Sequence, residues 1–335
     1  MVIRRQRGAV VVLVSGNVKR LKTALRAICG QNMKFNKVVV VPWGNERENI
    51  KRIVKEQQIT TEVVSSSGDN TLEGSRNNAL RAIANDPPDW VAFIDDDTII
   101  DPSWLCEMMR TGKALGNKFA FASLVRYVSK PNIVQSAGHI LFEGRPLDCG
   151  YGKPTSAICT TYSPLCPCGN SAFVPWEGIE KISCLDENVW DPRFEQWQAC
   201  FDFGLKLRLV DVSCRFVRSA LAKHEGLIER QKGVLGKEDV RKQLRSRILL
   251  YDKFYPVAER TEVIKVLEKR VYEKWKEAGY PNARSLRGEE MVETFKSALA
   301  EEKKLKKMES DIWVKKMERM NEVCRRALLF GGSMV

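Results

Sequence analysis

The chain has 335 residues, 44% of them hydrophobic and 29% charged, and its formal net charge is +13. This length and composition predict a soluble globular protein with one large or two modest domains and a buried core. No apolar run is long enough to span a membrane, and the run near the start is too short for a signal peptide, so we expect a cytoplasmic protein.

The first hundred residues alternate between short apolar runs and segments whose apolar residues recur at helical spacing. Such alternation predicts a mostly parallel sheet with helices on both faces. The predicted strands are 9–14, 38–41, 59–64 and 90–94, and the predicted helices between them are 21–28, 46–57 and 74–84.

In the remainder of the chain, the pattern of apolar residues changes twice. Residues 115–225 contain short β-like runs with Gly- and Pro-rich turns, among which we predict strands at 119–128 and 214–217 and a helix at 196–209. From about residue 236, apolar residues return at helical spacing. We therefore expect one domain over 1–226, with a first half at 1–112 and a second half at 113–226, followed by a helical appendage over 227–335.

Positive charge is concentrated in the last third of the chain. Residues 226–335 contain 26 Lys and Arg against 18 Asp and Glu. This imbalance fits an anionic partner, such as a membrane surface, and equally fits an ordinary solvated helical face. The apolar spacing of the same region also leaves oligomerisation open.

Ten cysteines are spread along the chain, several of them inside apolar segments. In a chain of this size without a secretion signal we expect reduced thiols. A group of five between Cys149 and Cys184 contains no CxxC pair, so its spacing indicates zinc only weakly.

Three consecutive carboxylates, Asp95, Asp96 and Asp97, follow the apolar run that starts at Trp90. In open α/β sheets, ligands bind beyond the carboxyl ends of strands. Three acids there would repel one another unless a cation such as Mg²⁺ or Mn²⁺ shares the site. Asp also ends strands simply because its side chain bonds turn backbone, but three after a fully apolar strand favour a metal site.

The segment from Gly68 to Ala79 places a turn and an arginine, Arg76, at the start of a predicted helix, with Ser75 as a possible cap. Helix N-termini offer free N–H groups to phosphates, and an arginine fork matches phosphate oxygens. Alone this is weak evidence, because Ser and Asn are ordinary capping residues.

These motifs occur in an order that resembles glycosyltransferase family 2 enzymes of the GT-A fold, which include rhamnosyltransferase-like members. The resemblance covers roughly residues 8–226. The segments that carry it are Gly74–Ala79, Asp89–Asp97, Pro102–Leu105, Gln135–His139, Gly169–Phe173, Leu185–Glu187, Asp202–Arg208 and His224.

The resemblance implies transfer of a sugar from a nucleotide-sugar donor to an acceptor hydroxyl, usually with inversion. Asp95 and Asp97 match the DxD motif that holds a divalent cation, and His224 matches a later histidine that completes this metal site. Arg76 stands where a contact to the donor phosphate is expected, and Asp96 is included in the donor site. The other histidine, His139, is expected to be an ordinary core or surface residue.

The sequence departs from the family pattern at two points. The Glu-Asp pair that normally supplies the catalytic base falls on Ala199 and Cys200, and a thiol is a poor base at neutral pH. Asp202 and, less favourably, Glu195 are the nearest carboxylates that could act instead. After the second strand, Trp43 and Asn45 stand near the position of an Asp that contacts the nucleotide base.

We therefore predict a metal-dependent hexosyl- or deoxyhexosyltransferase that uses Mn²⁺ or Mg²⁺ and a nucleotide-sugar donor. The acceptor would be a glycan, a lipid-linked molecule or a protein, and the basic helical region could hold the enzyme at a membrane. Two alternatives remain: a nucleotide-sugar-binding protein that has lost catalysis, and a glycosyltransferase that acts on nucleic acid. A nucleotidyltransferase is disfavoured because the first strand lacks a proper Gly-rich phosphate loop.

Overall fold

The computed structural model describes residues 8–43, 47–56, 61–64, 71–142, 145–158, 163–194, 198–225 and 237–254. The predicted helical appendage therefore lies outside the described residues, except for one helix over 237–254. The predictions for membrane contact, nucleic-acid binding and oligomerisation through residues 255–335 likewise concern undescribed residues. Among the helices that the structure does describe, none is both long and apolar enough to cross a membrane.

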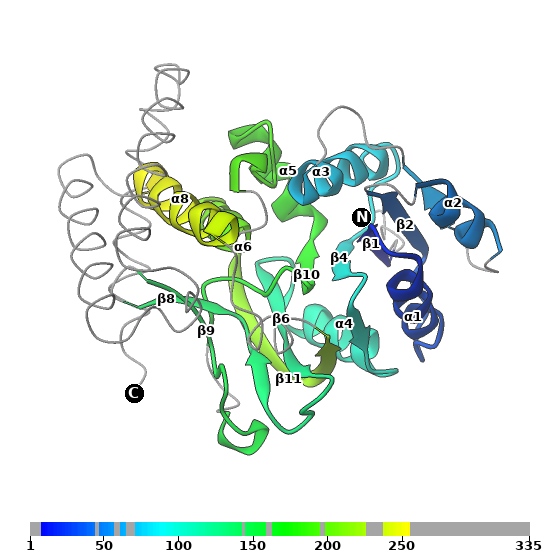
Figure 1. Ribbon diagram of the computed structural model, residues 1–335, viewed down its shortest axis with the longest axis horizontal. Helices are drawn as coiled ribbons and strands as arrows, with labels where there is room; N and C mark the ends of the chain where they lie inside the picture. Colours follow the sequence, from blue (N-terminus) through cyan, green and yellow to red (C-terminus); the bar gives the residue numbers. More distant parts are fainter. Residues whose placement is uncertain are drawn as a thin grey trace, which may run out of the picture.

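The first half of the fold has the predicted alternation of strands and helices (Figure 1). Its elements are β1 (Ala9–Ser15), α1 (Val18–Cys29), β2 (Lys37–Pro42), α2 (Arg47–Lys55), β3 (Thr61–Val63), α3 (Leu72–Ile83), β4 (Trp90–Asp95), β5 (Thr98–Ile100) and α4 (Trp104–Leu115). Strands β3, β2, β1 and β4 lie side by side in that order and are all parallel.

The second half extends the same sheet with strands of mixed direction. Its elements are β6 (Phe119–Tyr127), β7 (Val134–Ser136), β8 (His139–Phe142), β9 (Arg145–Asp148), the short 3-10 helix η2 (Thr155–Ala157), β10 (Ser171–Pro175), α5 (Trp176–Leu185), η3 (Pro192–Phe194), α6 (Ala199–Leu209), β11 (Ser213–His224) and α8 (Lys237–Phe254). Within the described residues, nine strands form one sheet, and β8 and β9 form a separate hairpin.

The order of strands across the large sheet is β3-β2-β1-β4-β10-β6-β11-β5, with β7 paired to β6. Strand β10 is antiparallel to both neighbours, and β11 is parallel to β6 but antiparallel to β5. Strand β11 is much longer than the predicted 214–217, because its pairing with β6 continues past an irregularity between Val217 and Leu221.

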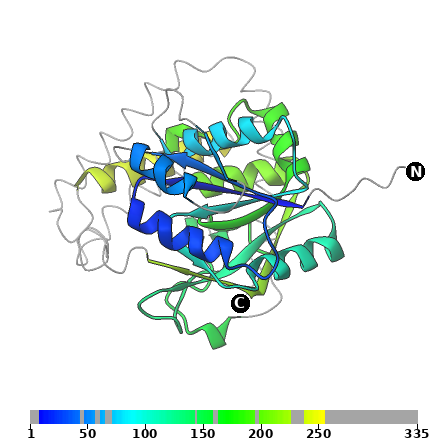
Figure 2. The same ribbon diagram turned by 90° about the vertical axis from the view of Figure 1, so that its right-hand side faces the viewer.

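Two helical layers cover the sheet, as Figures 1 and 2 show. All residues of β1 are buried, and alternate residues face opposite layers, as expected for a central parallel strand. The even-numbered residues of β1 pack with α3, α5, α6 and α8, and the odd-numbered ones pack with α1, α2 and α4. Helix α8 thus belongs to the same core as the sheet, although it follows the boundary predicted at residue 226.

Local sequence explains the helices that fix the carboxyl edge of the sheet. In α1, Asn17 caps the first turn by accepting the N–H of Arg20, and Leu21, Ala24, Leu25 and Ile28 form the buried stripe. Helix α3 begins earlier than predicted, because Thr71 rather than Ser75 is its cap. Ser75 is fully buried within the helix, so the expectation that it caps the helix was wrong.

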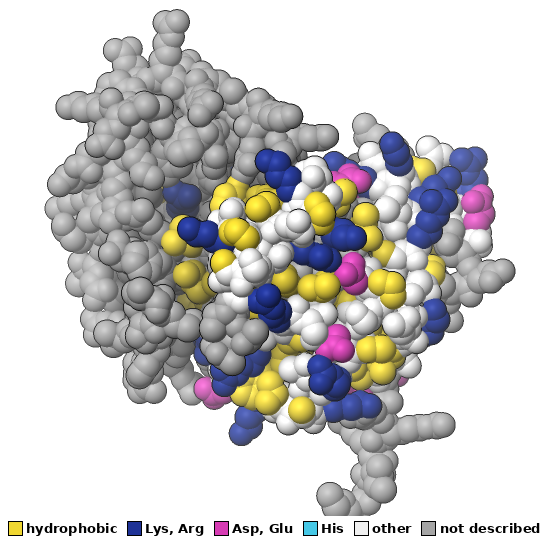
Figure 3. All heavy atoms as spheres, turned by 90° about the horizontal axis from the view of Figure 1, so that it is seen from below, with side chains coloured by type: hydrophobic (Ala, Val, Ile, Leu, Met, Phe, Trp, Pro, Cys, Tyr) yellow, Lys and Arg dark blue, Asp and Glu magenta, His cyan; other side chains and the backbone are white. Residues whose placement is uncertain are grey.

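On the face shown in Figure 3, Lys and Arg side chains lie scattered among apolar and uncharged ones. Scattered cations of this kind fit an ordinary solvated surface. The described part of this face therefore gives no separate support for an anionic partner.

Candidate active site

Pairing between distant strands brings the candidate metal ligands together. Asp95 ends β4, and Asp97 follows two residues later in the turn before β5. Strand β11 runs antiparallel to β5 and pairs His224 with Thr98, directly after Asp97. The N–H of Glu225 also donates to the carbonyl oxygen of Asp97 at 2.9 Å, which fixes this end of β11 beside the acidic turn.

One possible ligand atom from each of Asp95, Asp97 and His224 lies within 4.8 Å of the other two. Nε2 of His224 is 2.8 Å from Oδ1 of Asp97. Its other ring nitrogen, Nδ1, lies 2.8 Å from Nε2 and 3.0 Å from Oε1 of Gln135 on β7. A polar partner on the second nitrogen is the usual way in which proteins orient a metal-binding imidazole. The three side chains therefore fit a cation that prefers oxygen and imidazole ligands, such as Mn²⁺.

Gln135 was not predicted as part of the site. It belonged to a segment of the resemblance, but no spacing pattern in the sequence indicated that it would face His224. Its position follows from the short pairing of β7 with β6, which places Gln135 next to the end of β11.

Arg76 is almost fully buried and holds Asp95 rather than standing open at the helix terminus. Its guanidinium donates to Oδ1 of Asp95 at 2.7 Å and to the carbonyl oxygen of Gly169 at 3.2 Å. The same group lies 4.4 Å from the ring centroid of Trp190. Asn77 fixes that ring in turn, because it exchanges two hydrogen bonds with the backbone of Trp190.

Burial and mutual repulsion give the carboxylates different proton affinities. Burial raises the pKa of Asp95, and the nearby Asp97 raises it further against the opposing effect of Arg76. Burial also tends to raise the pKa of Asp97, but the hydrogen bond and charge of His224 lower it overall. The pKa of His224 is raised, because its pairing with Asp97 outweighs burial. The protonated form of His224, which this pairing favours, would offset negative charge that a bound cation would also offset.

The other predicted donor-site residues lie around this centre. Asp96 accepts a hydrogen bond from Oγ of Ser15 at 2.7 Å, and burial raises its pKa to about 6. Trp43 follows β2, donates its backbone N–H to the carbonyl oxygen of Ser15, and packs partly against the core. Asn45 and Glu195 lie outside the described residues.

The predicted base Asp202 lies within the core. It belongs to a group that we call the buried charge cluster, formed by Asp186, Asp191, Asp202, Lys206 and Lys253, with Arg193 bonded to Asp191 at its rim. Asp202 is 0% exposed and lies 2.8 Å from Nζ of Lys206 and 2.5 Å from Nζ of Lys253. A carboxylate held by two ammonium groups without solvent contact is poorly placed to take a proton from an acceptor.

Cys200, by contrast, lies next to the residues that hold Asp95. A Cβ atom added to Gly169 would come within 2.7 Å of the Cys200 sulfur and 3.3 Å of a guanidinium nitrogen of Arg76. The thiol thus occupies the wall of the site at the start of α6, while Asp202 points from the same helix into the core.

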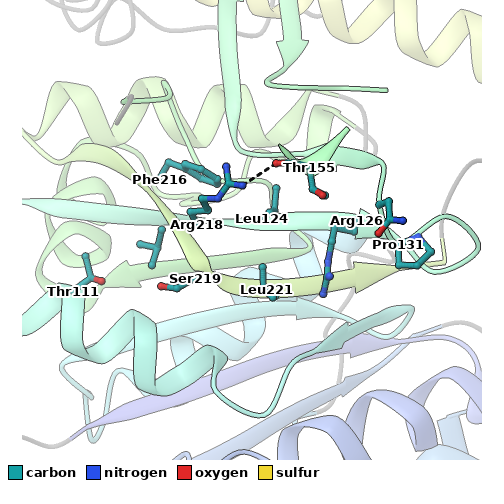
Figure 4. Close-up of a pocket in the computed structure, with 11 residues that line it drawn as sticks. Thr111, Leu124, Arg126, Pro131, Thr155, Phe216, Arg218, Ser219 and Leu221 are labelled. Carbon is teal, nitrogen blue, oxygen red and sulfur yellow. Dashed lines mark hydrogen bonds between the residues drawn. The ribbon is translucent and has the colours of Figure 1, made fainter. Parts of the chain in front are cut away.

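A separate pocket of about 630 Å³ opens along β6 and β11 (Figure 4). In that pocket Arg218 points toward the loop after β9 and donates to the carbonyl oxygen of Thr155 at 3.0 Å. None of the predicted site residues lines it.

A mixed sheet of this topology, with acidic residues after β4 and a histidine from the last strand beside them, is the GT-A fold. Three solved structures show the same fold at low sequence identity. GalNAc-T7 with UDP, GalNAc and Mn²⁺ has a TM-score of 0.57 and 11% identity over 88% of this chain and 55% of that one. The mannosyltransferase PcManGT from Pyrobaculum calidifontis, in complex with GDP-Man and Mn²⁺, has a TM-score of 0.51 and 12% identity over 98% of this chain and 88% of PcManGT. TarS from S. aureus has a TM-score of 0.50 and 14% identity over 96% of this chain and 55% of TarS.

The chain thus spans about half the length of GalNAc-T7 and of TarS. Residues 9–163 match the family described as Glycosyl transferase family 2. This match covers the first half of the fold, and the GT-A fold of the solved structures agrees with it. No curated protein matches the sequence.

Proposed function

We propose that this protein transfers a hexosyl or deoxyhexosyl group from a nucleotide-sugar donor to an acceptor hydroxyl, with inversion, at a site that uses Mn²⁺ or Mg²⁺. The observation that carries the proposal is the meeting of Asp95, Asp97 and His224 at the carboxyl edge of the sheet. The match of residues 9–163 to Glycosyl transferase family 2 supports the reaction type, and the Mn²⁺ and nucleotide ligands of GalNAc-T7 and PcManGT support the donor class.

The ion, when bound, would offset the negative charge that develops on the departing diphosphate. The residues of this chain prepare that site. Asp95 and Asp97 supply carboxylate oxygens, and His224 supplies an imidazole nitrogen whose ring Gln135 orients. Arg76 positions Asp95 and adds positive charge on the inner side of the site, close to where the diphosphate would lie. Asp96, Trp43 and Asn45 remain proposed donor contacts.

The test is calorimetric titration of UDP, GDP, dTDP and CMP with and without Mn²⁺. We expect Mn²⁺-dependent binding of one nucleotide to the wild type and its loss in Asp97→Asn. The matched control is Asp101→Asn, because Asp101 lies close in sequence but bonds Arg126 rather than the metal cluster. Absence of binding to any nucleotide, or equal binding by Asp97→Asn, would contradict the proposal. A nucleotide selected in this way identifies the donors for an assay of sugar transfer and anomeric configuration.

A second candidate is a nucleotide-sugar-binding protein without turnover. The placement of Asp202 in the buried charge cluster, with Cys200 at the expected base position, favours it. Intact Mn²⁺-dependent donor binding, together with no transfer to water or to any acceptor class in the assay, would support this candidate. Measured transfer would exclude it.

A further inference from the structure

A second group of metal-ligating side chains shares no residue with the Asp95 site, and its three members come from three segments. His139 begins β8, Asp148 ends β9, and Cys168 lies in the loop before β10. The hairpin pairs His139 directly with Asp148, so the two side chains project from the same face. His139 also forms a backbone bridge with Cys166, which brings the loop that carries Cys168 alongside.

We propose that His139, Asp148 and Cys168 form a zinc-binding site. One possible ligand atom from each residue lies within 4.8 Å of the other two. At zinc bond lengths of roughly 2.0–2.3 Å, tetrahedral geometry separates neighbouring ligand atoms by about 3.3–3.7 Å. The three residues are therefore within small side-chain adjustments of that geometry.

The contact between His139 and Asp148 also favours a shared ion. Nδ1 of His139 lies 3.0 Å from Oδ1 of Asp148. His139 is 7% exposed, so this ion pair lies in a buried position. Both atoms are ligands that Zn²⁺ accepts, so an ion bound there would take the place of the imidazole proton and be held by both side chains.

The chemistry of the three side chains selects zinc over the cations proposed for the donor site. A thiolate and an imidazole are ligands that Zn²⁺ prefers, whereas Mg²⁺ and Mn²⁺ prefer oxygen. Cys168 is a free thiol, and the side chain of Asp148 is 38% exposed. Solvent can therefore reach the site on the Asp148 side and supply a fourth ligand. Zinc would also hold the thiol in its deprotonated form, against the burial that raises the pKa of Cys168.

The position of the site indicates a purpose. Cys168 precedes Gly169, whose carbonyl oxygen accepts from Arg76, and Asn170, whose carbonyl oxygen accepts the N–H of Asp95 at 3.3 Å. A zinc ion would tie this short segment to the β8–β9 hairpin. The ion would thereby fix one wall of the donor site without taking part in donor binding.

The test measures metal content of the full-length, untagged protein after dialysis against metal-free buffer. We expect about one zinc per chain in the wild type and in Cys184→Ser, an exposed cysteine on α5 that serves as the matched control. We expect less than about a tenth of that in Cys168→Ser. Asp97→Asn should keep its zinc while losing Mn²⁺-dependent nucleotide binding, so failure of this proposal and of the proposed function are distinguishable.

Substitution by Co²⁺ gives an independent readout that can be taken on the wild type alone. Co²⁺ bound to the wild type should show the intense near-ultraviolet absorption of thiolate-to-metal charge transfer. That band should weaken in Asp148→Asn, which changes only a partly exposed side chain. A wild type without zinc and without this band, or zinc retained in Cys168→Ser, would overturn the proposal and leave His139 and Asp148 as a simple ion pair.

Discussion

Lys253 provides a strong test of how α8 belongs to this fold. The buried charge cluster contains three carboxylates, which are balanced by Lys206, Lys253 and Arg193. Lys253 is 3% exposed and lies within 2.8 Å of carboxylate oxygens of both Asp191 and Asp202. Lys253→Met keeps most of the side-chain volume but leaves one buried negative charge without a counterion. Removing one partner of a buried ion pair costs about 3–5 kcal/mol, so we expect a loss of that size in the free energy of unfolding.

The assay is urea unfolding followed by far-ultraviolet circular dichroism, with Lys181→Met as the matched control. Lys181 pairs with Glu177 on the surface of α5, with both side chains about half exposed, so its loss should cost no more than about 0.5 kcal/mol. The double variant Lys253→Met/Asp202→Asn removes one charge of each sign and should be less destabilised than the sum of the single variants. A loss below about 1 kcal/mol in Lys253→Met would refute the reasoning, because removing a buried counterion leaves an uncompensated buried carboxylate and should destabilise the fold by more than that.

Three further results follow from single residues. Burial would raise the pKa of Asp191, but Lys253 and Arg193 lower it well below its usual value. The charged Asp191 therefore stabilises the folded state above about pH 4, and this contribution is lost as the pH falls through the lower folded-state pKa. The free energy of unfolding should therefore fall more steeply with acid in the wild type than in Asp191→Asn. Gly138→Ala should lower the melting temperature more than Gly152→Ala; both glycines have positive φ, but only a Cβ at Gly138 meets neighbouring atoms, at 2.7 Å. Gln135→Ala should weaken Mn²⁺ binding by about 10- to 100-fold in a titration, and unchanged affinity would show that it does not orient the metal-binding imidazole.

The first half of the fold could be predicted because its signals are local. The apolar runs at β1, β2 and β4 became buried strands, and α1 and α2 carry the expected apolar stripes. Helix α3 differs, because it also buries polar and charged side chains such as Arg76 and Asn77. The end of the β4 strand was predictable for the same reason, since the run of apolar residues stops at Asp95.

The features of the site that could not be predicted from local sequence depend on strand register. The resemblance predicted that His224 joins Asp95 and Asp97, but nothing local to His224 shows that β11 continues for twelve residues and ends opposite the turn after β4. Gln135 and the group around His139 depend in the same way on β7 and on the β8–β9 hairpin. A metal site assembled from separate strands, as proposed for His139, Asp148 and Cys168, has no CxxC spacing, so the cysteine pattern alone could not indicate it.

Helix α6 links the site to the core, and this determines what turnover requires. Its first residues place the Cys200 sulfur beside Gly169 and Arg76, whereas Asp202 and Lys206 of the same helix lie in the buried charge cluster with Lys253 of α8. Freeing Asp202 to act as a base would break two buried ion pairs, at a cost comparable to that predicted for Lys253→Met. The helix is therefore anchored in a position that presents a thiol, rather than a carboxylate, to the proposed donor site. The proposal of sugar transfer thus needs an acceptor base other than Asp202, and Glu195, just before α6 in the sequence, is the other carboxylate that the sequence analysis put forward.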